Sequence, residues 1–96
     1  YHGIILDPPA YGRGPSGEKW VLEENFNELM SLCAQLLDGK GSFLVLNLYS
    51  LGFSSLIGNN VVESYLNPAE KQFGEFYLQS RTGIQLPLGT FMRLTI

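Results

Sequence analysis

A short apolar run that ends in an acid and two prolines constrains the fold of this chain more than any other feature. The residues Ile4–Leu6 follow one another without polar alternation, which is typical of a strand buried on both faces of a parallel sheet. Pro8 and Pro9 have no N–H to give to a sheet, and each disfavours helix in the residue before it. The strand is therefore expected to end at Asp7. A stiff loop carrying Tyr11 then follows at the carboxyl edge, where open α/β sheets bind their ligands.

The next predicted element is an amphipathic helix followed by a second buried strand. Asn25, with Glu28 three residues later, predicts the helix start, and Gly39 lies at the helix end. Its apolar face is expected to comprise Phe26, Leu29, Met30, Cys33, Leu36 and Leu37. Residues 42–47 then repeat the pattern of the first strand. A strand, a helix and a strand joined by short connections form a parallel crossover, so Asp7 and the segment 47–50 are expected at one sheet edge.

The last third of the chain predicts a second helix and two antiparallel strands. Ser54 or Ser55 is the expected N-cap of this helix, and Asn67-Pro68 ends it. Its expected core residues are Leu56, Ile57, Val61, Val62, Tyr65 and Leu66. Residues 73–80 and 89–96 are expected as strands, and the turn-rich segment 81–88 as their connection.

The segment between the first strand and the first helix contains Gly12, Gly14 and Gly17, which formally match the spacing of a dinucleotide-binding loop. That fingerprint requires its first glycine directly after the strand and its third inside the helix, and neither condition holds here. We therefore expect a flexible loop carrying Arg13, suited to a mobile lid over a substrate. Trp20 is expected to anchor this loop on the domain.

Composition limits the classes of function. The chain has 96 residues, of which 45% are hydrophobic, and a formal net charge of −3, so it is a globular chain without the basic face of an autonomous nucleic-acid binder. Its one cysteine excludes an internal disulfide, and no signal peptide or membrane-spanning run is recognisable. We expect a cytoplasmic protein with no membrane partner. The start at Tyr1, almost at a buried strand, indicates a fragment of a longer protein.

The sequence Asp7-Pro8-Pro9-Ala10-Tyr11 after an apolar strand resembles the fourth motif of class I S-adenosylmethionine (SAM)-dependent methyltransferases, and more narrowly that of ribosomal RNA methyltransferases. The order of the downstream elements is similar to the second half of that fold. The resemblance implies an α/β chain that forms the C-terminal half of a Rossmann-like sheet, with the last strand antiparallel. It also implies SAM as the cofactor. Residues 1–96 would then be a partial catalytic domain whose cofactor-binding half lies upstream.

The resemblance also implies roles for individual residues. Asp7 and the carbonyl of Pro8 would orient the acceptor nitrogen, Asp7 would touch the methionine end of SAM, and Tyr11 would stack on the base. The implied catalytic residues are Asp7, Pro8 and Pro9, and the implied substrate-binding residues are Tyr11, Arg13, Asn47 and Tyr49. Ala10 departs from the adenine-amino pattern, in which the aromatic residue directly follows the second proline. The methylated atom therefore stays open.

Cytosine C5 methylation is disfavoured, because it needs a cysteine where this chain has residues 47–50. Transfer to a base nitrogen of RNA, with other parts of a longer protein contacting the RNA, is the preferred hypothesis. The alternatives are a non-catalytic binding or scaffold module of the same fold, and another α/β protein in which Asp7-Pro8-Pro9 only ends a strand. In a half-sheet the first strand would be an unpaired edge, so strand-mediated self-association is also expected.

Overall fold

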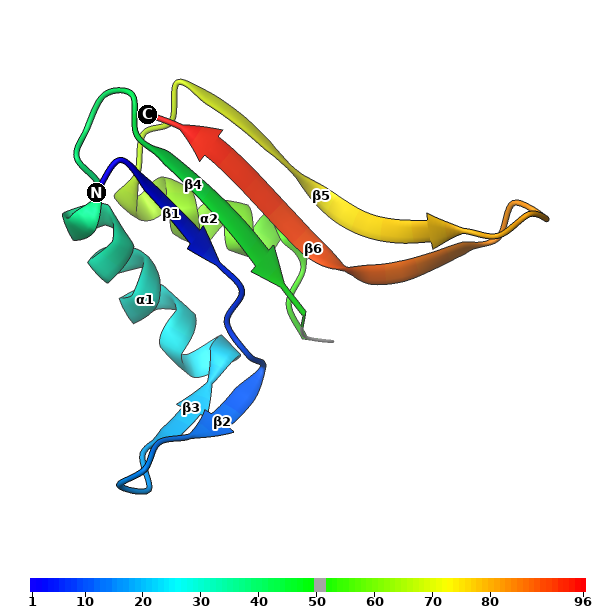
Figure 1. The fold of residues 1–96 in the computed structure, drawn as a ribbon, viewed down its shortest axis with the longest axis horizontal. Helices are drawn as coiled ribbons and strands as arrows, with labels where there is room; N and C mark the ends of the chain where they lie inside the picture. Colours follow the sequence, from blue (N-terminus) through cyan, green and yellow to red (C-terminus); the bar gives the residue numbers. More distant parts are fainter. Residues whose placement is uncertain (50–51) are drawn as a thin grey trace.

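The computed structural model describes residues 1–49 and 52–96, and its centre is a four-stranded mixed sheet (Figure 1). Its strands, in their order across the sheet, are β1 (Gly3–Leu6), β4 (Phe43–Leu48), β6 (Gln85–Thr95) and β5 (Glu70–Gln79). β1 pairs with β4 in parallel, whereas β6 is antiparallel to both β4 and β5. The last strand thus lies between its predecessor and the rest of the sheet, and it is antiparallel as the resemblance implied.

Two helices, α1 (Leu22–Leu36) and α2 (Ser55–Tyr65), cover one face of this sheet (Figure 1). The alternation along β4 shows the asymmetry: Leu44, Leu46 and Leu48 are buried, whereas Phe43 and Val45 are exposed. Within the described residues, no helix is long and apolar enough to cross a membrane.

The prediction that the first strand is buried on both faces is wrong for this chain. Ile5 of β1 lies opposite Val45 on the open face and is 75% exposed. Both helices of the described chain lie on the other face, so nothing in it covers this side chain. The apolar run is real, but the element that would bury its second face is not among residues 1–49 and 52–96.

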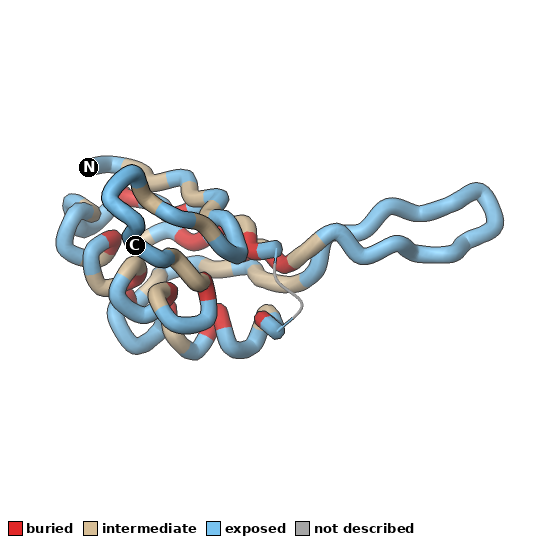
Figure 2. The backbone as a smooth tube through the Cα atoms, turned by 90° about the horizontal axis from the view of Figure 1, so that it is seen from below, coloured by how far each residue is buried: buried red, intermediate tan, exposed pale blue. Residues whose placement is uncertain are grey.

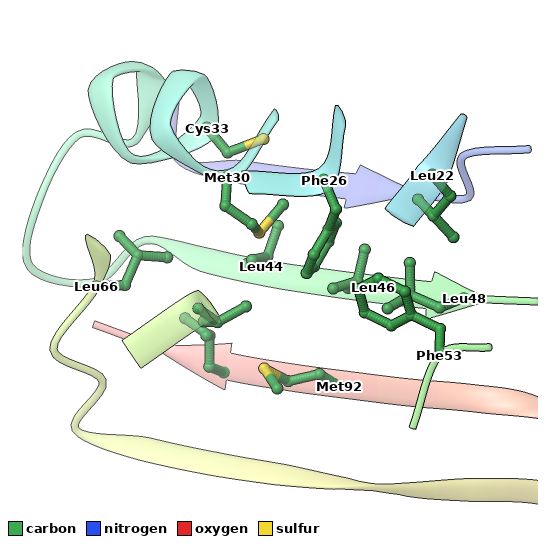
Figure 3. Close-up of a cluster of buried hydrophobic side chains, with 12 residues drawn as sticks. Leu22, Phe26, Met30, Cys33, Leu44, Leu46, Leu48, Phe53, Leu66 and Met92 are labelled. Carbon is green, nitrogen blue, oxygen red and sulfur yellow. The ribbon is translucent and has the colours of Figure 1, made fainter. Parts of the chain in front are cut away.

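The hydrophobic core fills the space between the two helices and the covered face of the sheet (Figure 3). From α1, Phe26 and Met30 point toward the leucines of β4. Phe26 meets Phe53 edge to face, with ring centroids 4.9 Å apart. The buried hydrophobic residues are Leu22, Phe26, Met30, Cys33, Leu44, Leu46, Leu48, Phe53, Val62, Leu66, Met92 and Leu94. Cys33 therefore serves packing, as expected, and burial raises the pKa of its thiol above the usual range.

The first helix begins earlier than predicted. Its N-cap is Val21 and not Asn25. The side chain of Asn25 contributes from inside the helix, where its Oδ1 accepts a 3.0 Å hydrogen bond from the N–H of Val21. Leu22 is fully buried and extends the apolar face by one more turn, whereas Leu36 is half-exposed at the other end. Burial of Leu22 fixes where the chain turns into the helix.

The cap of the second helix is as predicted, but its buried face is not. Ser54 Oγ accepts a 3.2 Å hydrogen bond from the N–H of Ile57. Leu56, Ile57 and Tyr65, which we expected in the core, are exposed. The residues of α2 and its end that are buried are Gly58, Asn59, Val62 and Leu66. Phe53 explains the difference, because it fills the core just before the helix and packs close to Gly58.

The segment expected to be a flexible lid forms a small antiparallel hairpin of β2 (Tyr11–Arg13) and β3 (Lys19–Val21). A turn closes it, with the N–H of Gly14 donating to the carbonyl of Glu18 at 2.8 Å. Trp20 anchors the hairpin as predicted, since its Nε1 donates to the carbonyl of Pro9 at 2.7 Å. The prediction of an unpaired loop is therefore wrong, because the backbone of this segment is paired and anchored.

The second half of the predicted connection 81–88 is strand. β5 and β6 stay paired from Glu70–Thr95 to Gln79–Gln85, so their ends project from the body as a two-stranded ribbon (Figures 1 and 2). We call residues 76–88 the arm. Pro87 had indicated a turn, but a β-bulge accommodates it: Phe76 pairs with Gly89 and Tyr77 with Pro87, which leaves one extra residue in β6.

We predict that Gly89→Ala destabilises the chain by about 2 kcal/mol or more. Gly89 has φ +131°, and an added Cβ would lie 2.8 Å from the carbonyl oxygen of Leu48. Gly74→Ala is the control, because its Cβ would meet the ring of Phe91 at an ordinary 3.6 Å. Urea unfolding followed by circular dichroism measures both variants. Equal effects of the two substitutions would contradict the tight contact at Gly89.

We also predict that the Cys33 thiol is shielded in the folded chain. It is buried and its raised pKa keeps it neutral near pH 8, so labelling by a thiol reagent should be at least about 100-fold slower than for a free cysteine. Labelling in urea should restore the ordinary rate. A folded chain that reacts as fast as the unfolded one would show that α1 does not pack as described.

Candidate functional site

Asp7 and Asn47 meet at the carboxyl edge of the two parallel strands. Leu6, the last residue of β1, is in register with Leu46 of β4, so the next residue on each strand comes to the same position along the edge. The Nδ2 of Asn47 donates a 2.9 Å hydrogen bond to Oδ1 of Asp7. The predicted meeting of these two residues is confirmed. Asp7 is exposed and Asn47 is half-buried.

The amide of Asn47 is oriented toward the carboxylate. Its Oδ1 is buried and has no hydrogen-bond partner, and the reverse orientation would place that oxygen against the oxygen of Asp7. Asn47 therefore holds the carboxylate of Asp7 in place. A carboxylate accepts several hydrogen bonds, so Asp7 keeps acceptor positions for a ligand at the exposed edge.

The loop of Pro8 and Pro9 is tied to the hairpin behind it. The carbonyl of Pro9 is taken by the indole of Trp20, and the carbonyl of Ala10 accepts a 3.0 Å hydrogen bond from the N–H of Leu22. Two fixed φ angles and these two bonds make a stiff corner after Asp7. Our sequence reasoning assigned Trp20 only as an anchor. Its indole N–H also occupies one acceptor position of the Pro9 carbonyl, a contact that the sequence does not signal.

Tyr11 and Arg13 lie together on β2, just beyond this corner. Arg13 Nε donates a 3.1 Å hydrogen bond to Oη of Tyr11, and both side chains are exposed. Residues two apart on a strand point to the same side, which explains the contact. The pair places a partly exposed aromatic ring and a guanidinium on the hairpin next to the sheet edge.

Tyr49 follows β4 but lies toward β6. A Cβ added at Gly89 would lie 3.3 Å from its ring, and Gly89 belongs to the strand on the other side of β4 from β1. Tyr49 there lines a cleft of about 320 Å³ together with Phe53, Ser54 and Glu75. The structure thus brings Asp7 and Asn47 together and Tyr11 and Arg13 together, with Tyr49 on the opposite flank of β4. Ser50, part of the predicted edge segment, lies outside the described residues.

The chemistry of this edge is that of hydrogen-bond acceptance beside an exposed aromatic ring. Among residues 1–49 and 52–96, no group of three or more His, Cys, Asp or Glu side chains could hold a metal ion. The N-terminus of α1 carries Glu23 and Glu24 in its first turn, which disfavours an anionic ligand there. An N–H-bearing group that stacks on an aromatic ring fits the edge best.

Comparison with solved structures identifies the fold. The chain matches the SAM-dependent methyltransferase from Agrobacterium tumefaciens with a TM-score of 0.84 and 27% identity, over 99% of this chain and 33% of that one. It also matches SMU.776, a protein assigned as a methyltransferase and crystallised with SAH, with a TM-score of 0.65 and 14% identity, over 99% of this chain and 26% of that one. No family model and no curated protein matches the sequence.

The chain spans about a third or less of the length of these solved proteins. Within that span the order of elements and the sheet topology agree with the Rossmann-like fold that the sequence predicted. The chain has the fold of one part of a class I SAM-dependent methyltransferase.

Proposed function

We propose that this chain is the acceptor-positioning half of a SAM-dependent methyltransferase that acts on a base nitrogen of RNA, most simply ribosomal RNA. The observation that carries the proposal is the hydrogen bond from Asn47 to Asp7 at the carboxyl edge of a sheet with this fold. It fixes an exposed carboxylate where the Asp-Pro-Pro motif of such enzymes is expected to act. The exposed ring of Tyr11 beyond the Pro8-Pro9 corner supports the same proposal.

The proposed roles follow from the chemistry of each side chain. Asp7 accepts a hydrogen bond from the N–H of the acceptor and so directs the nitrogen lone pair. Fixing that orientation removes entropy from the reaction. The carbonyl of Pro8 is the second acceptor in this proposal, since that of Pro9 is taken by Trp20. Tyr11 stacks on the base, which contributes roughly 1–3 kcal/mol. Arg13 holds the phenol of Tyr11 and is available to a phosphate.

SAM, when bound, supplies a methyl group on a sulfonium. Asp7 fits its methionine end, because an exposed carboxylate at the edge accepts a hydrogen bond from an ammonium group. A glycine-rich loop directly after a strand, which would hold the rest of the cofactor, is not found in this sequence, where Gly12, Gly14 and Gly17 belong to a hairpin. We therefore assign most of the cofactor contacts to a half that precedes these residues.

Two unpaired surfaces support this division. β1 is an edge strand whose outer backbone groups have no partner strand in the described chain. The open face of the sheet exposes Ile5, Phe43 and Val45 and holds an apolar hollow of about 400 Å³ bordered by Val45, Phe76 and Phe91. In our proposal the cofactor-binding half pairs with β1 and covers Ile5, Phe43 and Val45, while the arm from Phe76 outward stays uncovered; this half also supplies the RNA contacts that a chain of net charge −3 lacks. Without that half, the β1 edge is the surface through which we expect strand-mediated self-association.

We predict that residues 1–96 alone bind SAM or SAH only at millimolar concentration or not at all. The expected contacts of this chain are limited to the edge around Asp7, which is too few for tight binding. Isothermal titration of the 96-residue chain with each compound is the measurement. Micromolar binding would show that the cofactor site lies within these residues and would contradict the proposed division.

We further predict that Asp7→Ala, in the protein that joins this chain to its cofactor-binding half, lowers methyl transfer at least about 100-fold. The free energy of unfolding should fall by less than about 1 kcal/mol, because the carboxylate is exposed and makes one hydrogen bond. Asp38→Ala is the matched control. Asp38 is also an exposed carboxylate, but it lies beside His2, which precedes β1, and so at the other end of that strand from Asp7. Transfer of labelled methyl from SAM to ribosomal RNA is assayed for both. Equal activities of the two variants would remove Asp7 from the reaction, and a large loss of stability would make its role structural.

A further inference from the structure

The arm has an apolar face that nothing in the described chain covers. It projects from the body of the protein in both views (Figures 1 and 2). Leu78 pairs with Leu86, and Gln79 pairs with Gln85. Since side chains alternate along a strand and paired residues share a side, Phe76, Leu78, Ile84 and Leu86 lie on one face. These four side chains are 46%, 59%, 71% and 58% exposed, respectively.

The opposite face of the arm is more polar than this one. Tyr77 pairs with Pro87 there, next to the pair of Gln79 and Gln85. Tyr77 is 52% exposed, so this face is mixed, whereas the face of the other four side chains is apolar throughout. A ribbon face that is apolar throughout is expected only where it is buried against something.

The arm is ordered by its own contacts at both ends. At the tip, Ser80 Oγ accepts a 3.1 Å hydrogen bond from the N–H of Ile84, and Ser80 N–H donates to the carbonyl of Ile84 at 2.8 Å. At the root, the rings of Phe76 and Phe91 lie 4.7 Å apart. A two-stranded ribbon is marginal by itself in water, whereas four strands that share an apolar face can be stable.

The charge of the arm restricts its partner. Arg81 at the tip is the only Lys, Arg, Asp or Glu in residues 76–88. Nucleic acid would require a basic surface, and a charged peptide would require a complementary one. Two copies of this nearly uncharged face meet without repulsion, and an apolar, charge-poor contact is typical of homodimers.

We propose that two copies of this chain dimerise by packing the apolar faces of their arms against each other about a two-fold axis. With about 200 Å² for a fully exposed large apolar side chain, the four residues offer on the order of 500 Å² per copy. Two copies then bury about 1,000 Å², the lower limit for a specific interface. Pro87 has no N–H and weakens the arm as a template for edge-to-edge pairing, which favours face-to-face contact. This inference does not rest on the proposed function.

Leu86→Glu tests the proposal against Gln85→Glu. Both variants add the same charge to neighbouring exposed positions, but only Leu86 lies on the apolar face. Sedimentation equilibrium of the 96-residue chain over micromolar to millimolar concentration measures association. Ile5→Lys is placed in the background of every variant so that the open sheet face and the β1 edge do not contribute.

We expect a monomer–dimer equilibrium in the Ile5→Lys background that Gln85→Glu leaves unchanged. Leu86→Glu should raise the dimer dissociation constant at least about tenfold, because it brings two carboxylates together across the axis. Circular dichroism should show unchanged folding of both variants, since both positions are exposed. A background chain that stays monomeric overturns the proposal, as do equal effects of the two substitutions or a dimer that survives Leu86→Glu.

Discussion

The parallel pairing of β1 with β4 is the constraint on which the rest of the structure depends. It forces α1 to return the chain from one sheet edge to the other, and it sets the register that ends with Leu6 beside Leu46. The next residue on each strand is polar, so Asp7 and Asn47 come to the same place and bond. The prolines after Asp7 end β1 there, and Trp20 then holds the corner from the hairpin side. A chemical group at a fixed position thus results from strand register and proline geometry.

The surfaces of the molecule also differ in how far their apolar side chains are covered. One sheet face is covered by α1 and α2 and supplies nearly all of the buried apolar residues. The other face exposes Ile5, Phe43 and Val45, the edge of β1 is unpaired, and the arm presents a further apolar face. A chain with its polar site at one edge and three uncovered surfaces is suited to work inside a larger assembly. In our proposals, the cofactor-binding half takes the first two surfaces and a second copy takes the arm.

The local signals in the sequence were sufficient wherever one residue type has one strong preference. Pro8 fixed the end of β1, Ser54 fixed the cap of α2, and the period of Phe26, Met30 and Cys33 fixed the buried face of α1. The parallel pairing of β1 with β4 also followed, because a short crossover leaves little choice, whereas the place of the last strand came only from the resemblance. The polar ends of the first two strands therefore predicted that Asp7 and Asn47 meet.

The remaining features depend on contacts that are distant in the sequence. β2 and β3 are too short to show a period, so their pairing was taken for a loop. Phe53 enters the core ahead of α2 and turns Leu56 outward. In β6, Pro87 indicated a turn, but a bulge accommodates it and the strand continues. Tyr49 lies by Gly89 of β6. This contact joins residues 40 apart in the sequence, so no local pattern signals it.

The most direct test of this structure is the energetic coupling between Asp7 and Asn47. A double-mutant cycle with Asp7→Ala, Asn47→Ala and the combined variant, measured by urea unfolding of the 96-residue chain, isolates it from all other contacts. We expect a stabilising coupling of about 0.5–1 kcal/mol, as for a hydrogen bond at a partly exposed site. A coupling of zero would mean that the two strand ends do not meet, and the site as described here would not exist.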